Sequence, residues 1–224
     1  MWQQSSDGRR LMAMRSGNED GRWTRVLGVD PAAAGPTGYG IVESDGRRCR
    51  MLHYGALRIT TKRQKECAGA ALQDVHALLC ELIEKFMPDV LAVESVFTAL
   101  NMRTALRLAE VRGVVLLAAA QHGVAVHSYA PREVKASVAG NGHADKRQIQ
   151  LMVRALLSMT ETPEPADAAD ALAVALCHLQ LEQARRRFAM PDAGKQGKPR
   201  GARLAITAVA GATRNLLPRI QPTR

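Results

Sequence analysis

Residues 25–44 read RVLGVDPAAAGPTGYGIVES, and this stretch decides the fold class. Its first apolar run ends at Asp30, and a loop rich in alanine, glycine and proline separates that run from a second one, TGYGIVES. Short apolar runs bounded by turn-forming residues predict β-strands. The turn sequence Ser44-Asp45-Gly46 then leads into RCRMLHYGALRI, a third run of this kind. The segment therefore predicts three strands joined as a meander.

From residue 66 onward, helical and extended patterns alternate. Apolar residues recur every three or four positions up to Phe86, which predicts a helix with one buried face, whereas the continuous run VLAVES predicts a strand buried on both faces. The predicted elements of this half are helices over 66–86, 101–121, 145–157 and 165–187 and strands over 90–95 and 124–130. The order βββαβαβαα predicts an α/β domain, with a mixed sheet of about five strands flanked by helices on both faces.

The chain has room for one domain core. Its 224 residues include 46% hydrophobic and 23% charged side chains, which is typical of a globular protein and excludes a fibrous or wholly disordered one. Polar sequence with little periodicity predicts a disordered extension over residues 1–24. The folded domain is expected over 25–187, followed by a basic, disordered tail over 188–224.

The net charge of +10 favours a polyanionic partner, but its position leaves two interpretations open. Residues 182–224 hold ten lysines and arginines against two acids, so most of the surplus lies near the C-terminus. A basic tail can bind nucleic acid weakly, or it can be a solvated extension. The charge alone does not decide between these.

Hydropathy and cysteine spacing bear on the compartment. The longest apolar run, Val114 to Ala120, is far shorter than the roughly 20 residues that cross a bilayer, so no membrane span is expected. No apolar stretch of signal-peptide length follows the polar N-terminus. The four cysteines form no C-x-x-C pair, which argues against a disulfide framework or a cysteine-based zinc site. The cytoplasm is therefore the expected compartment.

Acidic residues at the ends of predicted elements carry the chemical signal. Asp30 and Glu94 each close an apolar strand, and the carboxyl ends of strands are where α/β proteins gather their ligands. Asp167 and Asp170 lie three residues apart at the start of a helix, on one face of its first turn. Each acid alone could be a helix or turn cap. Taken together, with no basic residue in their local segments, they favour a site for Mg²⁺ or Mn²⁺ and hence a metal-dependent nuclease.

Four motifs occur in an order that resembles a known family. GVDP with TGYG, then AVESVF, then NGHADKRQ and finally PADAADALAVAL resemble RuvC, the bacterial Holliday junction resolvase family, over about Val26 to His178. The resemblance implies an RNase H-like fold and a homodimer that makes paired symmetric nicks in a four-way DNA junction during recombination and repair. It also implies work beside a branch-migration helicase complex.

The resemblance assigns roles to individual residues. Asp30, Glu94, Asp167 and Asp170 match an acidic tetrad that holds two Mg²⁺ ions, with Mn²⁺ as a substitute, and directs water onto the phosphodiester to leave 5′-phosphate and 3′-hydroxyl ends. Lys135 and Lys146 match basic positions near the scissile phosphate, although most lysines are simply solvated. Phe97 matches an aromatic side chain pressed against bases at the crossover, although a lone phenylalanine is more often a core residue.

The loop after Asp30 departs from the family pattern. The family usually has glycine two positions after this acid and a basic residue soon after, whereas this chain has Ala32 and a loop that is one residue longer. Gly35 is the candidate to supply a bend with positive φ. Arg103 and Arg107 on the next helix are candidates to replace the missing basic residue.

Two rival functions remain at this point. A sugar-kinase type of ATPase shares a related sheet, but it needs a second, duplicated domain for which 224 residues leave no room. A non-catalytic DNA-binding protein of the same fold is the second rival, and the four acids argue against it because carboxylates repel a phosphate backbone. Paired nicks need two twofold-related sites, so a dimer is expected, with the helix holding Leu100, Leu106, Leu108 and Val111 as its interface.

Overall fold

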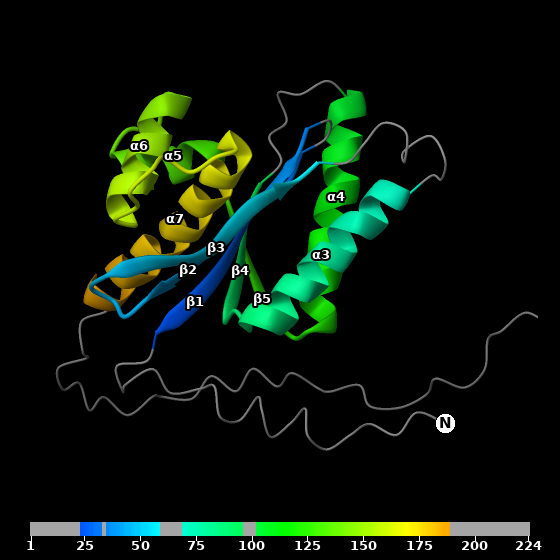
Figure 1. Ribbon diagram of the computed structural model, residues 1–224, viewed down its shortest axis with the longest axis horizontal. Helices are drawn as coiled ribbons and strands as arrows, with labels where there is room; N and C mark the ends of the chain where they lie inside the picture. Colours follow the sequence, from blue (N-terminus) through cyan, green and yellow to red (C-terminus); the bar gives the residue numbers. More distant parts are fainter. Residues whose placement is uncertain (1–22, 33–34, 59–68, 96–101, 189–224) are drawn as a thin grey trace, which may run out of the picture. The chain divides into compact units, whose positions relative to one another are not determined.

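The protein is described by a computed structural model in which residues 23–32, 35–58, 69–95 and 102–188 are placed. Figure 1 shows these elements in chain order, and they are as follows: β1 (Thr24–Asp30), β2 (Thr37–Ser44), β3 (Cys49–Leu57), α3 (Ala70–Phe86), β4 (Val90–Glu94), α4 (Met102–Gln121), β5 (Ala125–Tyr129), α5 (Pro131–Ala139), α6 (Lys146–Leu156) and α7 (Ala166–Phe188). The two segments predicted to be disordered, 1–24 and 188–224, lie almost wholly outside the described residues.

The five strands form one mixed sheet in the order β3-β2-β1-β4-β5. β1 pairs antiparallel with β2, which pairs antiparallel with β3, so the predicted meander is confirmed. On its other side β1 pairs parallel with β4, and β4 pairs parallel with β5. The carboxyl ends of β1, β4 and β5 therefore meet at one edge of the sheet, which places Asp30 beside Gly38 and Glu94 beside Tyr129.

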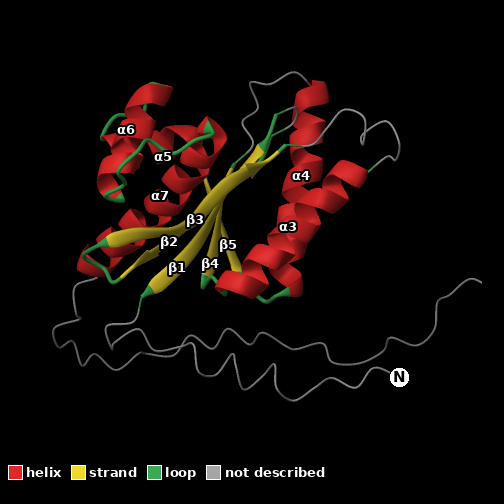
Figure 2. Cartoon of the chain, viewed as in Figure 1, coloured by secondary structure: helices red, strands yellow, loops and turns green. Residues whose placement is uncertain are grey.

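Helices cover both faces of the sheet, as the sequence predicts. α5, α6 and α7 lie on one face, and α3 and α4 lie on the other (Figures 1 and 2). Each interface has its own hydrophobic cluster, because side chains alternate between the two faces along every strand: Val26 and Ala92 face α7, whereas Leu27 and Leu91 face α3 and α4. Asp30 lies four residues after Val26, and Glu94 lies two residues after Ala92. The alternation therefore places both acids on the face that α7 covers.

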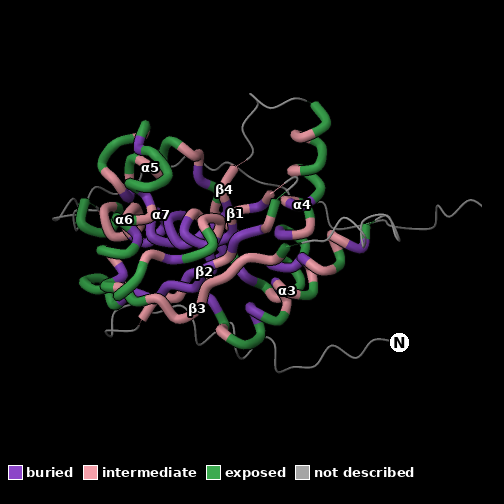
Figure 3. The backbone as a smooth tube through the Cα atoms, turned by 45° about the horizontal axis from the view of Figure 1, so that its top comes forward, coloured by how far each residue is buried: buried purple, intermediate pink, exposed green. Residues whose placement is uncertain are grey.

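α7 is the most deeply buried helix. Every residue from Ala171 to Leu179 is buried, and Figure 3 shows the helix enclosed between the sheet and its neighbours. A helix that is apolar on all sides is expected in such a position. Its small residues let it approach the sheet closely, because alanine adds only a methyl group to the helix surface.

Glycines on the strands complete this close approach. A Cβ atom added at Gly38 would lie 1.9 Å from the backbone oxygen of Asp167, and one at Gly28 would lie 2.1 Å from that of Ala171. At Gly40 an added Cβ would lie 2.6 Å from Leu172. At Gly28 and Gly38 no other residue type fits without moving the backbone of α7, whereas at Gly40 the Leu172 side chain would have to move. The glycines of β1 and β2 therefore determine how near the first turn of α7 sits to Asp30.

The structure corrects one expectation. The order predicted from the sequence lacks α5, whereas in the structure three helices, rather than two, follow β5. Its sequence signals are Pro131 at the first position, Glu133 accepting from the Ala130 amide at 3.3 Å, and Gly140 with φ 72° after its last residue. The bend expected at Gly35 stays a prediction, because residues 33–34 of this loop lie outside the described residues.

The described helices also include no candidate for a membrane span. None of them combines the length and the apolar character that crossing a bilayer requires.

We predict that Gly38→Ala destabilises the protein by about 3 kcal/mol, the upper part of the usual range for overpacking, because the new methyl group overlaps the backbone of α7. Gly35→Ala is the matched control, since the nearest atom to its added Cβ is 3.8 Å away. Urea denaturation followed by circular dichroism measures both. Equal midpoints for the two variants would show that the close approach does not constrain α7.

Candidate functional site

Four acidic side chains from three separate segments meet at the carboxyl edge of the sheet. Asp30 ends β1, Glu94 ends β4, and Asp167 and Asp170 come from the first turns of α7. Oxygen atoms of Asp30, Asp167 and Asp170 all lie within 4.8 Å of one another. Glu94 joins this group through a hydrogen bond with Asp30. The structure thus brings together all four acids that the sequence singles out.

Burial and mutual repulsion make this cluster costly to ionise. Burial, followed by the charges of Glu94, Asp170 and Asp167, raises the pKa of Asp30 to about 9. Burial also raises the pKa of Glu94, while the hydrogen bond from Asp30 and the charge of Lys135 act in the opposite direction. Without a cation the two carboxyl groups share a proton at neutral pH, with Asp30 as the donor.

These residues fit a divalent cation. Carboxylate oxygens are the ligands that hard ions such as Mg²⁺ and Mn²⁺ prefer, and three of them already converge within 4.8 Å. A bound cation would replace the shared proton and remove the repulsion that raises the pKa of Asp30. The four acids therefore have a chemical reason to lie together.

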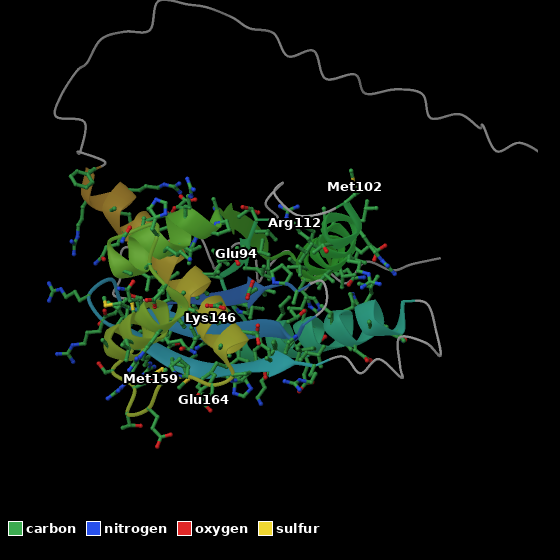
Figure 4. The ribbon with its side chains drawn as sticks, turned by 90° about the horizontal axis from the view of Figure 1, so that it is seen from above. Glu94, Met102, Arg112, Lys146, Met159 and Glu164 are labelled. Atoms are coloured by element: carbon green, nitrogen blue, oxygen red, sulfur yellow. The ribbon has the colours of Figure 1, made fainter. Side chains whose placement is uncertain are left out.

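Two lysines lie beside the acids. Lys146, the first residue of α6, places its Nζ 3.0 Å from Oδ2 of Asp170, and this hydrogen bond raises the pKa of the lysine. Lys135 comes from α5, and its charge acts on Glu94. Glu94 and Lys146 are labelled in Figure 4. The lysine that pairs with Asp170 comes from α6, a helix that contributes none of the four acids.

Both lysines line one pocket with two of the four acids, Glu94 and Asp170. Its volume is about 190 Å³, and its lining residues are Glu94, Pro131, Val134, Lys135, Lys146, Ile149, Asp170, Ala173 and Val174. Its apolar lining residues come from α5, α6 and α7, and its charged lining residues are Glu94, Lys135, Lys146 and Asp170. Sequence reasoning misses Pro131 and Val134 because it misses α5. The proline at the first helical position is the signal that could have found them.

A buried hydrogen-bond network supports the edge that carries Glu94. The hydroxyl of Tyr129 lies 2.6 Å from Nδ1 of His178, and both side chains are buried. Burial lowers the pKa of His178 to about 4, so the neutral ring accepts this bond. The carbonyl of Tyr129 in turn accepts from the backbone N–H of Ser95 at 2.8 Å and from its Oγ at 3.1 Å. The network ties α7 and β5 to the end of β4.

Two further candidates within the described residues do not line this pocket. Arg103 and Arg107 lie exposed on α4, and neither lines the pocket with Glu94 and Lys146. Phe97 lies outside the described residues. The DNA contacts predicted for these residues are therefore untested.

Comparisons with known proteins show which family the chain belongs to. Residues 26–178 match the family model described as crossover junction endodeoxyribonuclease RuvC. RuvC of Caldicellulosiruptor saccharolyticus is 43% identical over 156 residues, covering 69% of this chain and 92% of its own length. RuvC of Marinobacter nauticus is 43% identical over 179 residues, covering 80% and 97%.

The fold agrees as well. The structure of Thermus thermophilus RuvC in complex with a Holliday junction substrate superposes with a TM-score of 0.66 at 36% identity, covering 72% of this chain and 96% of that one. The RNase H-like fold implied by the sequence motifs is confirmed.

The raised pKa of Asp30 gives a prediction with a definite sign. Because the folded pKa of about 9 lies above the ordinary carboxyl value, the metal-free protein holds an extra proton between about pH 4 and 9. Its stability therefore falls as pH rises through this window. Asp30→Asn removes this loss and raises the melting temperature in EDTA at pH 9 by about 2 °C or more, which corresponds to at least about 1 kcal/mol. Mg²⁺ should stabilise the wild-type protein but not this variant.

Thermal denaturation at pH 5 to 9, with EDTA or with Mg²⁺, provides the measurement. Glu161→Gln is the control, because Glu161 is exposed and lies outside the acidic cluster. If the melting temperatures of the wild type and of Asp30→Asn changed with pH in parallel in EDTA, the proposed repulsion between the buried acids would be refuted.

Proposed function

The chain belongs to the RuvC family of crossover junction endodeoxyribonucleases, and from this we propose that it resolves four-way DNA junctions by hydrolysing phosphodiester bonds at the carboxylate cluster. The observation that carries the proposal is that carboxylate oxygens of Asp30, Asp167 and Asp170 lie within 4.8 Å of one another, with Glu94 hydrogen-bonded to Asp30. Recombination and DNA repair are the processes that need such an enzyme. The cytoplasm, where chromosomal DNA is found in bacteria, is its expected compartment.

We further propose that the four acids hold Mg²⁺, two ions per subunit, with Mn²⁺ as a substitute. Bound divalent ions supply a water of lowered pKa and neutralise charge on the attacked phosphate. Asp30 must release its proton before the cluster is loaded, because a protonated carboxyl is a poor ligand. Because loading displaces this proton, the Mg²⁺ concentration needed for half-maximal activity should fall as pH rises.

The two lysines have separate tasks in this mechanism. Lys146 already contacts Asp170 at 3.0 Å, so it can bridge an acid of the cluster and a phosphate oxygen. Lys135 lines the same pocket from α5 and supplies a second positive charge for the phosphate. Water attacks phosphorus, the bond to the 3′ oxygen breaks, and that oxygen takes up a proton. The products are 5′-phosphate and 3′-hydroxyl ends, which a ligase can join.

A homodimer would place two such sites on one junction. The outer side of α4 carries an apolar stripe at spacings of three and four residues, and its large members Met102, Leu106 and Leu117 are 75%, 58% and 52% exposed. Met102 projects outward from α4 in Figure 4. Gly113 lies in the same stripe with nothing within 4 Å of an added Cβ, which leaves room for a partner helix. We propose a second copy of the chain as its occupant.

The predicted interface residues need one correction. Val111 is buried against α3 and the sheet, so it belongs to the core and not to this stripe. Leu108 is half-buried, Leu106 is exposed as expected, and Leu100 lies outside the described residues. A branch-migration helicase complex stays a prediction of the family resemblance.

Asp167→Asn separates the nuclease from a non-catalytic junction-binding protein. Removing one ligand of the cluster should lower the cleavage rate by at least 100-fold, the order of loss seen for transition-state charge stabilisers, while junction affinity changes little. Gel analysis of nicked strands and fluorescence anisotropy of the same labelled junction measure the two properties. Asp145→Asn is the matched control, because Asp145 caps α6 and stands outside the cluster. Equal cleavage by the two variants would contradict the proposed role of Asp167.

Leu106→Glu tests the dimer. A charge in the middle of the apolar stripe should convert a dimer of about 49 kDa into a monomer of 24.3 kDa. The reason is that burying an unpaired carboxylate in the interface costs much free energy. Light scattering after size-exclusion chromatography gives the mass. Leu151→Glu on α6, where Leu151 is 47% exposed, is the control outside the stripe. A dimer that persists in Leu106→Glu would place the interface elsewhere.

A further inference from the structure

A second charged surface lies at the end of the sheet opposite the acids. Thr24 pairs with Ser44 there, and the turn between β2 and β3 meets the last turns of α7 (Figure 1). Gln183 of α7 donates a hydrogen bond to the carbonyl of Gly46 in that turn, so two distant segments form one surface. Its arginines, which we call the arginine end, are Arg47, Arg48, Arg50, Arg185, Arg186 and Arg187.

Only some of these arginines form ion pairs with acids of the same domain. Arg50 pairs with the buried carboxylate of Glu43 and lies over the ring of Trp23 at 4.4 Å, so it is a structural residue. Arg185 pairs with Glu182 at 2.6 Å. Arg47 and Arg48 are exposed, and within the described ranges their guanidinium groups make no hydrogen bond or ion pair.

The arginines of the turn have no evident structural reason. Arg185, Arg186 and Arg187 lie in the last turn of α7, where basic residues complement the helix dipole, so their position has a structural reason. Arg47 and Arg48 belong to no helix, so this explanation does not extend to them. The nearby Asp45 does not neutralise them fully, because its Oδ1 accepts the backbone N–H groups of both residues at 2.7 Å. These bonds fix the turn that presents both arginines.

The separation from the acids suits a DNA duplex. Asp170 and Arg187 lie 17 residues apart on one continuous helix, a span of about 25 Å at 1.5 Å per residue. Successive phosphates of one DNA strand are about 3.4 Å apart along the axis, so this span corresponds to roughly 7 base pairs. A duplex arm that leaves the crossover along the direction of α7 therefore comes within reach of the arginine end.

We propose that the arginine end is a second DNA-contacting surface, which binds phosphates of a junction arm about 7 base pairs from the cleavage site. One guanidinium group can donate two parallel hydrogen bonds to the oxygens of one phosphate. A junction arm that is bound both at the crossover and at the arginine end is fixed in direction as well as in position. The inference rests on the proposed function, because it takes the junction as the ligand. An acidic protein surface is the competing partner for the same charges.

The test uses the full chain and a four-way junction with arms of 20 base pairs, in Ca²⁺ so that binding can be measured without cleavage. Hydroxyl-radical footprinting should show protection at the crossover and again about 7 base pairs along an arm in the wild type. Arg47→Gln with Arg48→Gln should lose the distal protection and keep the crossover protection. The slope of log affinity against log salt should become shallower by about 0.9 for each phosphate contact removed.

Lys85→Gln is the control, because Lys85 lies in the last turn of α3, which covers the opposite face of the sheet. It should leave the distal footprint unchanged. A wild type without distal protection, or a double variant that keeps both the footprint and the salt slope, overturns the inference and leaves the acidic protein surface as the alternative. Cleavage of the same junction by the wild type in Mg²⁺ is read separately and tests the proposed function, so the two failures are distinguishable.

Discussion

The close approach of α7 to the sheet is the constraint on which the site depends. Gly28 and Gly38 leave no room for a side chain beneath the helix, and this is why the oxygens of Asp167 and Asp170 come within 4.8 Å of Asp30. A helix seated on larger side chains would hold the same acids several ångströms away. The repulsion that raises the pKa of Asp30 is thus built into the packing of β1 and β2 against α7.

This packing and the site chemistry oppose each other until a cation binds. Without one, the fold holds like charges together, and the cost is relieved by a proton on Asp30 and by Lys146 beside Asp170. Enzymes commonly place such destabilised groups at their active sites, where the strain serves the reaction. The buried hydrogen bond between Tyr129 and His178 links β5 to α7 on the same face of the sheet. It helps to hold the ends of β4 and β5 in place despite the repulsion between the acids.

Much of this arrangement was predictable from local sequence. The strand ends at Asp30 and Glu94 follow from short apolar runs, and the three-residue spacing of Asp167 and Asp170 places both on one side of a helix. α5 was not predictable from periodicity, because only Val134 and Val138 of its nine residues are buried. The pairing of Lys146 with Asp170 depends on how α6 packs against α7, and no spacing within a single segment contains that information.

Cleavage of a synthetic four-way junction, with a linear duplex of the same sequence as the control, tests the central claim most directly. If the four carboxylates form a metal-dependent junction nuclease, Mg²⁺ will give paired, symmetric nicks in the junction, the duplex will stay intact, and EDTA will abolish cutting. Binding of the junction without any cut in Mg²⁺ or Mn²⁺ would contradict the account and reduce the protein to a DNA-binding module that retains the fold.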